Sequence, residues 1–133
     1  MSYNVGDVIA ERAVHLTRES LVRYAGASGD FNPIHYRDDV AASVGLPGVL
    51  AHGMLTMGLA SSVVVSALDA GATITEYGVR FTRPVVVDPE SGADVSVLAK
   101  VGAVDETSAR IDLTVKHADT TVLVKAQLRV SLR

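Results

Sequence analysis

The most apolar stretch of this 133-residue chain reads GMLTMGLASSVVVSAL and covers residues 53–68. Apolar side chains occur on most sides of a helix drawn over it, which predicts one long helix buried on most sides. The valines at 63–65 would also suit a strand. We predict a helix because no turn signal occurs before Asp69 and Gly71. A membrane span needs roughly 20 apolar residues, so a buried helix is expected.

The C-terminal half alternates apolar and polar residues with a period of two, which is typical of strands with one buried face. The alternation covers residues 93–103, 109–115 and 122–132. It is imperfect over 74–81, where a further strand is predicted, and a short leading strand or turn is predicted within 3–16. Successive strands joined by short polar turns predict an antiparallel meander. A bent sheet packed on the long helix gives an α+β class.

Two shorter helices are predicted between the leading strand and the long helix. Thr17 is a suitable N-cap for a helix over 18–25, with Leu21 and Val22 turned inward. A second helix is predicted over 38–44. The segment between these helices is predicted to be a loop, because it contains both glycine and proline.

Composition excludes several classes of protein. The net charge of -3 gives no strongly basic surface for nucleic acid, and the absence of cysteine excludes disulfides and thiolate chemistry. Four scattered histidines lack the i,i+4 spacing of a helical metal site, so no metal is predicted. The N-terminus is polar and does not resemble a signal peptide. We therefore expect a soluble cytoplasmic protein with no membrane segment.

The loop after the first helix carries a candidate acid–base pair. Asp30, Asn32 and His35 lie within six residues of each other, and Pro33 makes the loop stiff and extended. A carboxylate and an imidazole on such a loop can converge on one water near neutral pH. This pair suits the addition of water to a carbon–carbon double bond, or its removal. Asn32 could hold the loop or position the water. Taken singly, each residue is more typical of a turn, surface or core position than of a catalytic site, and only the combination indicates function.

Gly53 has a separate rationale at the start of the long helix. The first N–H groups of a helix lack intrahelical acceptors and carry partial positive charge. A glycine there lets a carbonyl approach without a Cβ in the way, so the N–H could stabilise negative charge on that oxygen. The alternative is that Gly53 only permits close packing. No chemistry is predicted for His52, which could be an N-cap or a packing residue.

The stretch YAGASGDFNPIH at residues 24–35, followed by Ala41, resembles the hydratase-2 motif of the MaoC-like dehydratases. These are (R)-specific enoyl-CoA hydratases and (3R)-hydroxyacyl-ACP dehydratases. Residues 51–58 and 75–82 are most similar to the B-type component of the (3R)-hydroxyacyl-ACP dehydratase in the mycobacterial type II fatty-acid synthase. The resemblance covers most of the chain and implies a single hot-dog domain over 1–133, in which a curved antiparallel sheet wraps around a long central helix.

The resemblance also implies a hydro-lyase of fatty acid metabolism that reversibly hydrates a trans-2-enoyl thioester to the (3R)-hydroxyacyl thioester. Asp30 and His35 would hold the water, Asn32 would support the loop, and the Gly53 amide would bind the thioester oxygen. Ser61 falls where some hydratases carry a serine near the substrate, so Ser61 and Asn32 are candidate substrate-binding residues. The acyl group would arrive on CoA or acyl carrier protein. No cofactor or metal is implied, and a homodimer or a heterodimer with another hot-dog subunit is expected.

Two alternatives remain open at this point. Hot-dog thioesterases share the fold and usually place an acid on or near the central helix, but no Asp or Glu occurs within 54–68. A non-catalytic partner subunit of a heterodimeric dehydratase would only shape an acyl tunnel, and the intact pair of Asp30 and His35 argues against it. Arg80 and Arg83 are candidate contacts to the acyl carrier, although a strand-end charge is the simpler interpretation of each.

Overall fold

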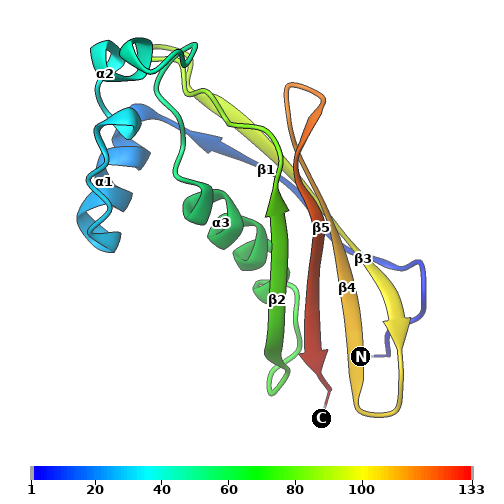
Figure 1. The fold of residues 1–133 in the computed structure, drawn as a ribbon. Coiled ribbons are helices and arrows are strands. Elements are labelled where there is room, and N and C mark those ends of the chain that lie inside the picture. Colours follow the sequence, from blue (N-terminus) through cyan, green and yellow to red (C-terminus); the bar gives the residue numbers. More distant parts are fainter. Residues whose placement is uncertain (1, 133) are drawn as a thin grey trace.

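A five-stranded antiparallel sheet forms the framework of the computed structural model, which describes residues 2–132 (Figure 1). The strands are β1 (Val8–Leu16), β2 (Thr73–Phe81), β3 (Ala93–Val104), β4 (Ser108–His117) and β5 (Thr120–Ser131). Their order across the sheet is β1-β3-β4-β5-β2. The neighbours β3, β4 and β5 form the predicted meander, because short polar turns return the chain to the adjacent position.

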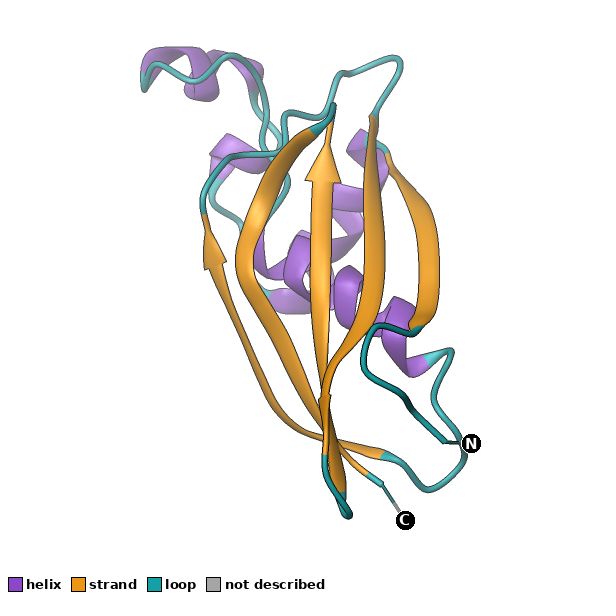
Figure 2. Ribbon diagram, turned by 90° about the vertical axis from the view of Figure 1, so that its right-hand side faces the viewer, coloured by secondary structure: helices purple, strands orange, loops and turns teal. Residues whose placement is uncertain are grey.

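The helices lie together on one side of this sheet, as Figure 2 shows with the sheet in front of them. They are α1 (Arg18–Ser28), a short 3₁₀ helix η1 (Pro33–His35), α2 (Asp38–Ser43) and α3 (Gly53–Val65). Among the described residues, none of these helices is long and apolar enough to cross a membrane. The curved sheet around α3 is the hot-dog arrangement of the α+β class, which confirms the predicted fold class.

The hydrophobic core lies between α3 and the sheet. Alternate residues of β3 such as Val95, Val97 and Ala99 are almost fully buried, whereas Ser96 between them is exposed. The buried side of α3 meets this face through Leu59, Ala60, Val63 and Val64. Burial of apolar area on this scale is the main stabilising term of such a layer.

Helix α3 is shorter and less enclosed than its composition predicts. It ends at Val65 rather than near Leu68. Met54 in its first turn and Val65 at its end are 59% and 54% exposed, so the expected burial on most sides is wrong for one face. The distribution of apolar residues around a helix shows how apolar each side is. It does not show which sides are covered by other parts of the same chain.

Helix α1 begins where predicted and ends later. Thr17 and Ser20 form a reciprocal capping box at its start. The helix continues to Ser28 instead of stopping at residue 25, because Gly29 adopts the left-handed conformation at φ 78° that ends helices. Val22 is 59% exposed, so its predicted inward orientation is wrong. The later end matters because the chain leaves α1 directly into the loop that carries Asp30.

Strand β5 contains a double bulge that the alternating pattern did not reveal. Its pairing with β4 shifts between Leu113 and Val115 and again between Val115 and Lys116, and β5 carries one extra residue at each place. Leu123 is therefore 2% exposed beside Val122, whereas Val124, which the alternation predicts to be buried, is only partly so. The bulge turns two consecutive apolar side chains toward the helices.

Candidate active site

A chain of side-chain-to-backbone hydrogen bonds stiffens the loop after α1. Ser28 Oγ accepts from the Asp30 N–H at 3.1 Å, and Asp30 Oδ1 accepts from the Asn32 N–H at 3.1 Å. Asn32 Oδ1 in turn accepts from the Ile34 N–H at 3.2 Å and caps η1. These bonds compete well with solvent because each spans only two residues. The structure therefore places the Asn32 side-chain oxygen on the loop itself.

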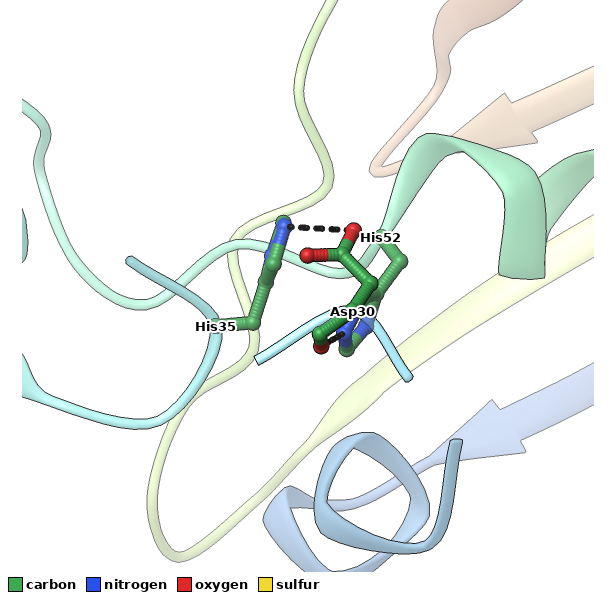
Figure 3. A group of neighbouring side chains, drawn as sticks. All are labelled: Asp30, His35 and His52. Carbon is green, nitrogen blue, oxygen red and sulfur yellow. Dashed lines mark hydrogen bonds and ion pairs between the residues drawn. The ribbon is translucent and has the colours of Figure 1, made fainter. Parts of the chain in front are cut away.

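The turn of η1 brings His35 back beside Asp30. His35 Nε2 lies 3.9 Å from Asp30 Oδ2, as the dashed line in Figure 3 marks. That separation is too long for a direct hydrogen bond. It matches two groups that each bond to one shared water at about 2.8 Å. The His35 side chain is 10% exposed and that of Asp30 is 51% exposed, so solvent reaches the pair from the carboxylate side.

The tautomer of His35 follows from its second nitrogen. His35 Nδ1 lies 2.6 Å from the carbonyl oxygen of Leu50, which can only accept a hydrogen bond. Nδ1 therefore carries the proton in the neutral ring, and Nε2 is left as an acceptor facing Asp30. Two acceptors, a carboxylate and an imidazole nitrogen, can take both hydrogens of one water and leave its lone pairs free.

His52 completes the cluster, although no chemistry was predicted for it. It is 1% exposed, and its Nε2–H donates to the Asp30 carbonyl oxygen at 3.2 Å. Its ring stacks on the ring of His35 with centroids 3.8 Å apart, and Tyr24 meets it edge-on at 4.8 Å. Burial lowers the pKa of His52, so the ring is held neutral. The available signal was a histidine directly before the glycine that starts α3.

Gly53 and His35 line the same cavity of about 320 Å³. The lining also includes the apolar side chains of Phe81 and Leu123, the second of which the bulge in β5 turns inward. A Cβ added to Gly53 would lie 3.0 Å from Phe81 Cε1, so the predicted packing role of Gly53 has a physical basis too. The cavity therefore joins a helix N-terminus, an imidazole and an apolar wall in one space.

The remaining sequence candidates lie at different distances from this cavity. Ser61 is two turns further along α3, donates to the Gly58 carbonyl at 2.9 Å, and is absent from the cavity lining within residues 2–132. Arg83 lines the cavity. Arg80 is exposed on β2 and, in the described part of the chain, lies outside the lining.

A metal is poorly suited to the cluster, even though Asp30, His35 and His52 offer ligand atoms within 4.8 Å of one another. The two rings are stacked with 22° between their planes. Their in-plane lone pairs therefore point side by side instead of converging on one centre. One nitrogen of each ring is also occupied by a backbone carbonyl.

This chain is similar to known proteins in both sequence and fold. The model of the MaoC like domain matches residues 4–122. The 3-hydroxyacyl-thioester dehydratase X of Mycobacterium tuberculosis is 35% identical over 83 residues, which are 62% of this chain and 29% of that protein. The (R)-specific enoyl-CoA hydratase of Rhodospirillum rubrum is 29% identical over 124 residues, which are 89% of this chain and 86% of that protein.

The similarity in fold extends over more of the chain than the similarity in sequence to the mycobacterial dehydratase. A solved structure described as a MaoC-like dehydratase superposes with a TM-score of 0.89 at 35% identity, over 99% of this chain and 41% of the solved one. The chain thus spans less than half the length of that protein and of the mycobacterial dehydratase. Since the family model covers most of the sequence and the hot-dog fold agrees, the chain belongs to the MaoC-like domain family.

Proposed function

We propose that the protein catalyses the reversible hydration of a trans-2-enoyl thioester to the (3R)-hydroxyacyl thioester, as a hydro-lyase without a cofactor. The observation that carries this proposal is the 3.9 Å separation of His35 Nε2 from Asp30 Oδ2, where His35 lines the same cavity as Gly53. Two relatives whose names state dehydration of 3-hydroxyacyl thioesters and (R)-specific hydration of enoyl-CoA support the same chemistry.

The proposed reaction begins with a water held between Asp30 and His35. Asp30 Oδ2 takes one water proton as the oxygen bonds to C3 of the enoyl group, while His35 Nε2 accepts the other O–H and fixes the direction of attack. Electrons of the double bond move to the thioester oxygen and form an enolate. The proton taken from the water is then delivered to C2, so the pair returns to its starting state after each turnover.

The enolate oxygen would be stabilised at the start of α3. Gly53 contributes the first N–H of the helix, which has no intrahelical acceptor and carries the positive end of the helix dipole. An oxyanion donor of this type typically contributes about 2.7–4 kcal/mol to the transition state. Asn32 acts one step away, since its side chain caps η1 and thereby fixes the distance from Asp30 to His35.

The acyl carrier and Ser61 belong to the same proposal. CoA and acyl carrier protein both end in a phosphopantetheine arm, and Arg83 at the cavity is the cation best placed to meet its polar part. Ser61 lies on the outer face of α3, half-buried. For that reason we propose that Ser61 would reach substrate only where a second subunit extends the cavity along α3.

A second hot-dog subunit is the proposed partner. The face of α3 that exposes Met54 and Val65 also carries Ser61 and Ser62, and Phe81 at the end of β2 is 54% exposed. Strand β2 is an edge of the sheet, where unpaired backbone groups can accept another strand. The resemblance of residues 51–58 and 75–82 to the B-type component of the mycobacterial dehydratase supports either a homodimer or a pair with a non-identical subunit. Light scattering of the purified chain would separate these two cases.

The test of the proposed function is the rate at which the purified protein removes the enoyl absorbance of crotonyl-CoA. The expected product is (3R)-hydroxybutyryl-CoA with no release of free CoA thiol. Stoichiometric thiol release would instead identify a thioesterase. A non-catalytic partner subunit would show no turnover by itself. Its turnover would appear only when a second hot-dog subunit is added, and that turnover would remain after Asp30 is replaced.

A further inference from the structure

Two histidines connect the catalytic loop to the segment that precedes α3, and they do so reciprocally. His35 of the loop donates from Nδ1 to the carbonyl of Leu50, and His52 donates from Nε2 to the carbonyl of Asp30. The Leu50 N–H also donates to the carbonyl of Ile34 at 3.1 Å. Between these bonds the two rings are stacked. The loop is therefore fixed to the start of the helix by more than its own internal turns.

His52 is the group that reaches Asp30 from outside the loop. Asp30 makes its other backbone and side-chain hydrogen bonds to Ser28 and Asn32, each two residues away. The bond from His52 spans 22 residues and holds the main chain of Asp30 against the residue that directly precedes Gly53. Without it, the half-exposed carboxylate would depend on the loop alone for its position relative to His35.

The second nitrogen of His52 indicates that packing alone does not explain the residue. Nδ1 is buried and has no hydrogen-bond partner within the described residues. An unsatisfied buried acceptor costs free energy that an apolar ring of similar size would avoid. The groups facing the ring are Tyr24 from α1, Asp30 from the loop and His35 from η1. The donor at Nε2 is what a histidine supplies there and a phenylalanine cannot.

We propose that His52 is a positioning residue of the hydration reaction, whose Nε2–H fixes the Asp30 main chain while its ring fixes the plane of His35, so that both groups reach one water. This inference rests on the proposed function. His52 touches no reacting atom in it. Its effect passes through Asp30 and His35, and a misplacement of about 1 Å can cost roughly 100-fold in rate.

The kinetic test compares His52→Phe with His52→Gln in the full chain, using crotonyl-CoA. Phenylalanine keeps a flat ring of similar size and loses the donor, whereas the glutamine amide can place an N–H near the former Nε2. We expect His52→Phe to lower kcat by roughly 10- to 100-fold with KM within about twofold. His52→Gln should retain kcat within about fivefold of the unaltered protein, because the donor to Asp30 is kept.

Two kinetic results would overturn the positioning role. The first is a His52→Phe variant with the kcat of the unaltered protein. The second is an equal loss in both variants accompanied by an equal fall in Tm, which is the pattern of a packing residue. If the unaltered protein fails to hydrate crotonyl-CoA, the proposed function fails first, and the measurement that follows still reports on His52.

A nitrogen-15 histidine spectrum of the unaltered protein provides that second measurement and needs no variant to fold. The expected His52 signal at pH 8 carries its proton on Nε2 and a bare Nδ1. Assignment of the proton to Nδ1 would contradict the bond to the Asp30 carbonyl and with it the inference.

Discussion

Two histidine–aspartate pairs in this molecule contain the same residue types but differ in separation, exposure and surroundings. On the sheet, His15 Nδ1 of β1 bonds directly to Asp94 Oδ1 of β3 at 2.7 Å, with both side chains more than half exposed. Beside α3, His35 and Asp30 stand 3.9 Å apart, with the imidazole buried and its other nitrogen bonded to a carbonyl. The closer pair is already satisfied, and the wider pair has room for a reactant.

The difference teaches that contact between a carboxylate and an imidazole does not by itself mark a site. The surface pair of His15 and Asp94 is solvated, and such pairs contribute little to stability. What distinguishes His35 is a fixed tautomer, a neighbouring cavity and a helix N-terminus that lines the same space. Matched substitutions at the two pairs should therefore have very different effects.

The largest expected effect is on turnover, from substitutions at the inner pair of Asp30 and His35. Asp30→Asn and His35→Ala should each lower kcat for crotonyl-CoA by roughly 100- to 10,000-fold, because each removes one of the two acceptors of the water. The matched changes Asp94→Asn and His15→Ala should leave kcat within about twofold, since that pair lies outside the proposed machinery. Equal losses at the two pairs would remove the distinction between them.

A smaller effect is expected at Gly53. Gly53→Pro removes the N–H proposed to face the enolate and should lower kcat by roughly 100- to 1,000-fold. Proline is tolerated at the first helical position, and His52 already has the extended conformation, φ -59° and ψ 131°, that precedes proline.

The control for the amide is Gly53→Ala, which keeps the N–H and adds a Cβ that must displace the Phe81 ring. Its kcat should exceed that of the proline variant by at least about tenfold, because the oxyanion donor remains. Similar rates in both variants would assign Gly53 to packing alone.

Gly92, which lies beside the outer pair of His15 and Asp94, is expected to affect stability instead of turnover. Gly92 has φ +70°, and a Cβ there would collide with the Leu16 carbonyl and lie 2.9 Å from His15 Nε2. Gly92→Ala should therefore lower the free energy of unfolding by about 1–3 kcal/mol, with kcat of the folded protein retained. Chemical denaturation checks the first quantity. An unchanged denaturation midpoint would show that the backbone around Gly92 accommodates the added Cβ without a loss of stability.

The smallest effect is a pH dependence of stability from His52. Burial lowers the pKa of His52 in the folded state, so below the unfolded-state value of about 6.5 the unfolded chain binds the proton more strongly. The contribution of the neutral ring to stability is complete above that value and is lost as the pH falls from it through the lower folded-state pKa. The Tm of the unaltered protein should thus fall more between pH 7.5 and 5.5 than that of His52→Phe. Parallel curves would contradict a neutral buried ring.

Local patterns were sufficient for much of the architecture. Strands β3 and β4 followed from alternation, and the start of α1 from Thr17, because each depends on neighbours in the chain. The bulge in β5 was missed because Val122, Leu123 and Val124 are all apolar, so no polar residue marks the change of face. The open face of α3 was missed for a related reason, since apolar composition does not identify what covers it.

The candidate site also has a part that local sequence predicts and a part that it does not. Asp30, Asn32 and His35 share one loop, and the structure brings His35 and Gly53 to one cavity, while their catalytic roles stay predictions. The contacts of His52 could not be predicted, because its partners come from the loop and from α1 and meet it only in three dimensions.

The central claim is that Asp30 and His35 act on one water, and a kinetic double-mutant cycle tests it most directly. Hydration of crotonyl-CoA would be measured for Asp30→Asn, for His35→Ala and for the double variant. Groups that serve a single step are strongly non-additive, so the double variant should be no more than about threefold slower than the slower single variant. Losses that multiply across the two positions would mean that the carboxylate and the imidazole act independently, and the shared water would be wrong.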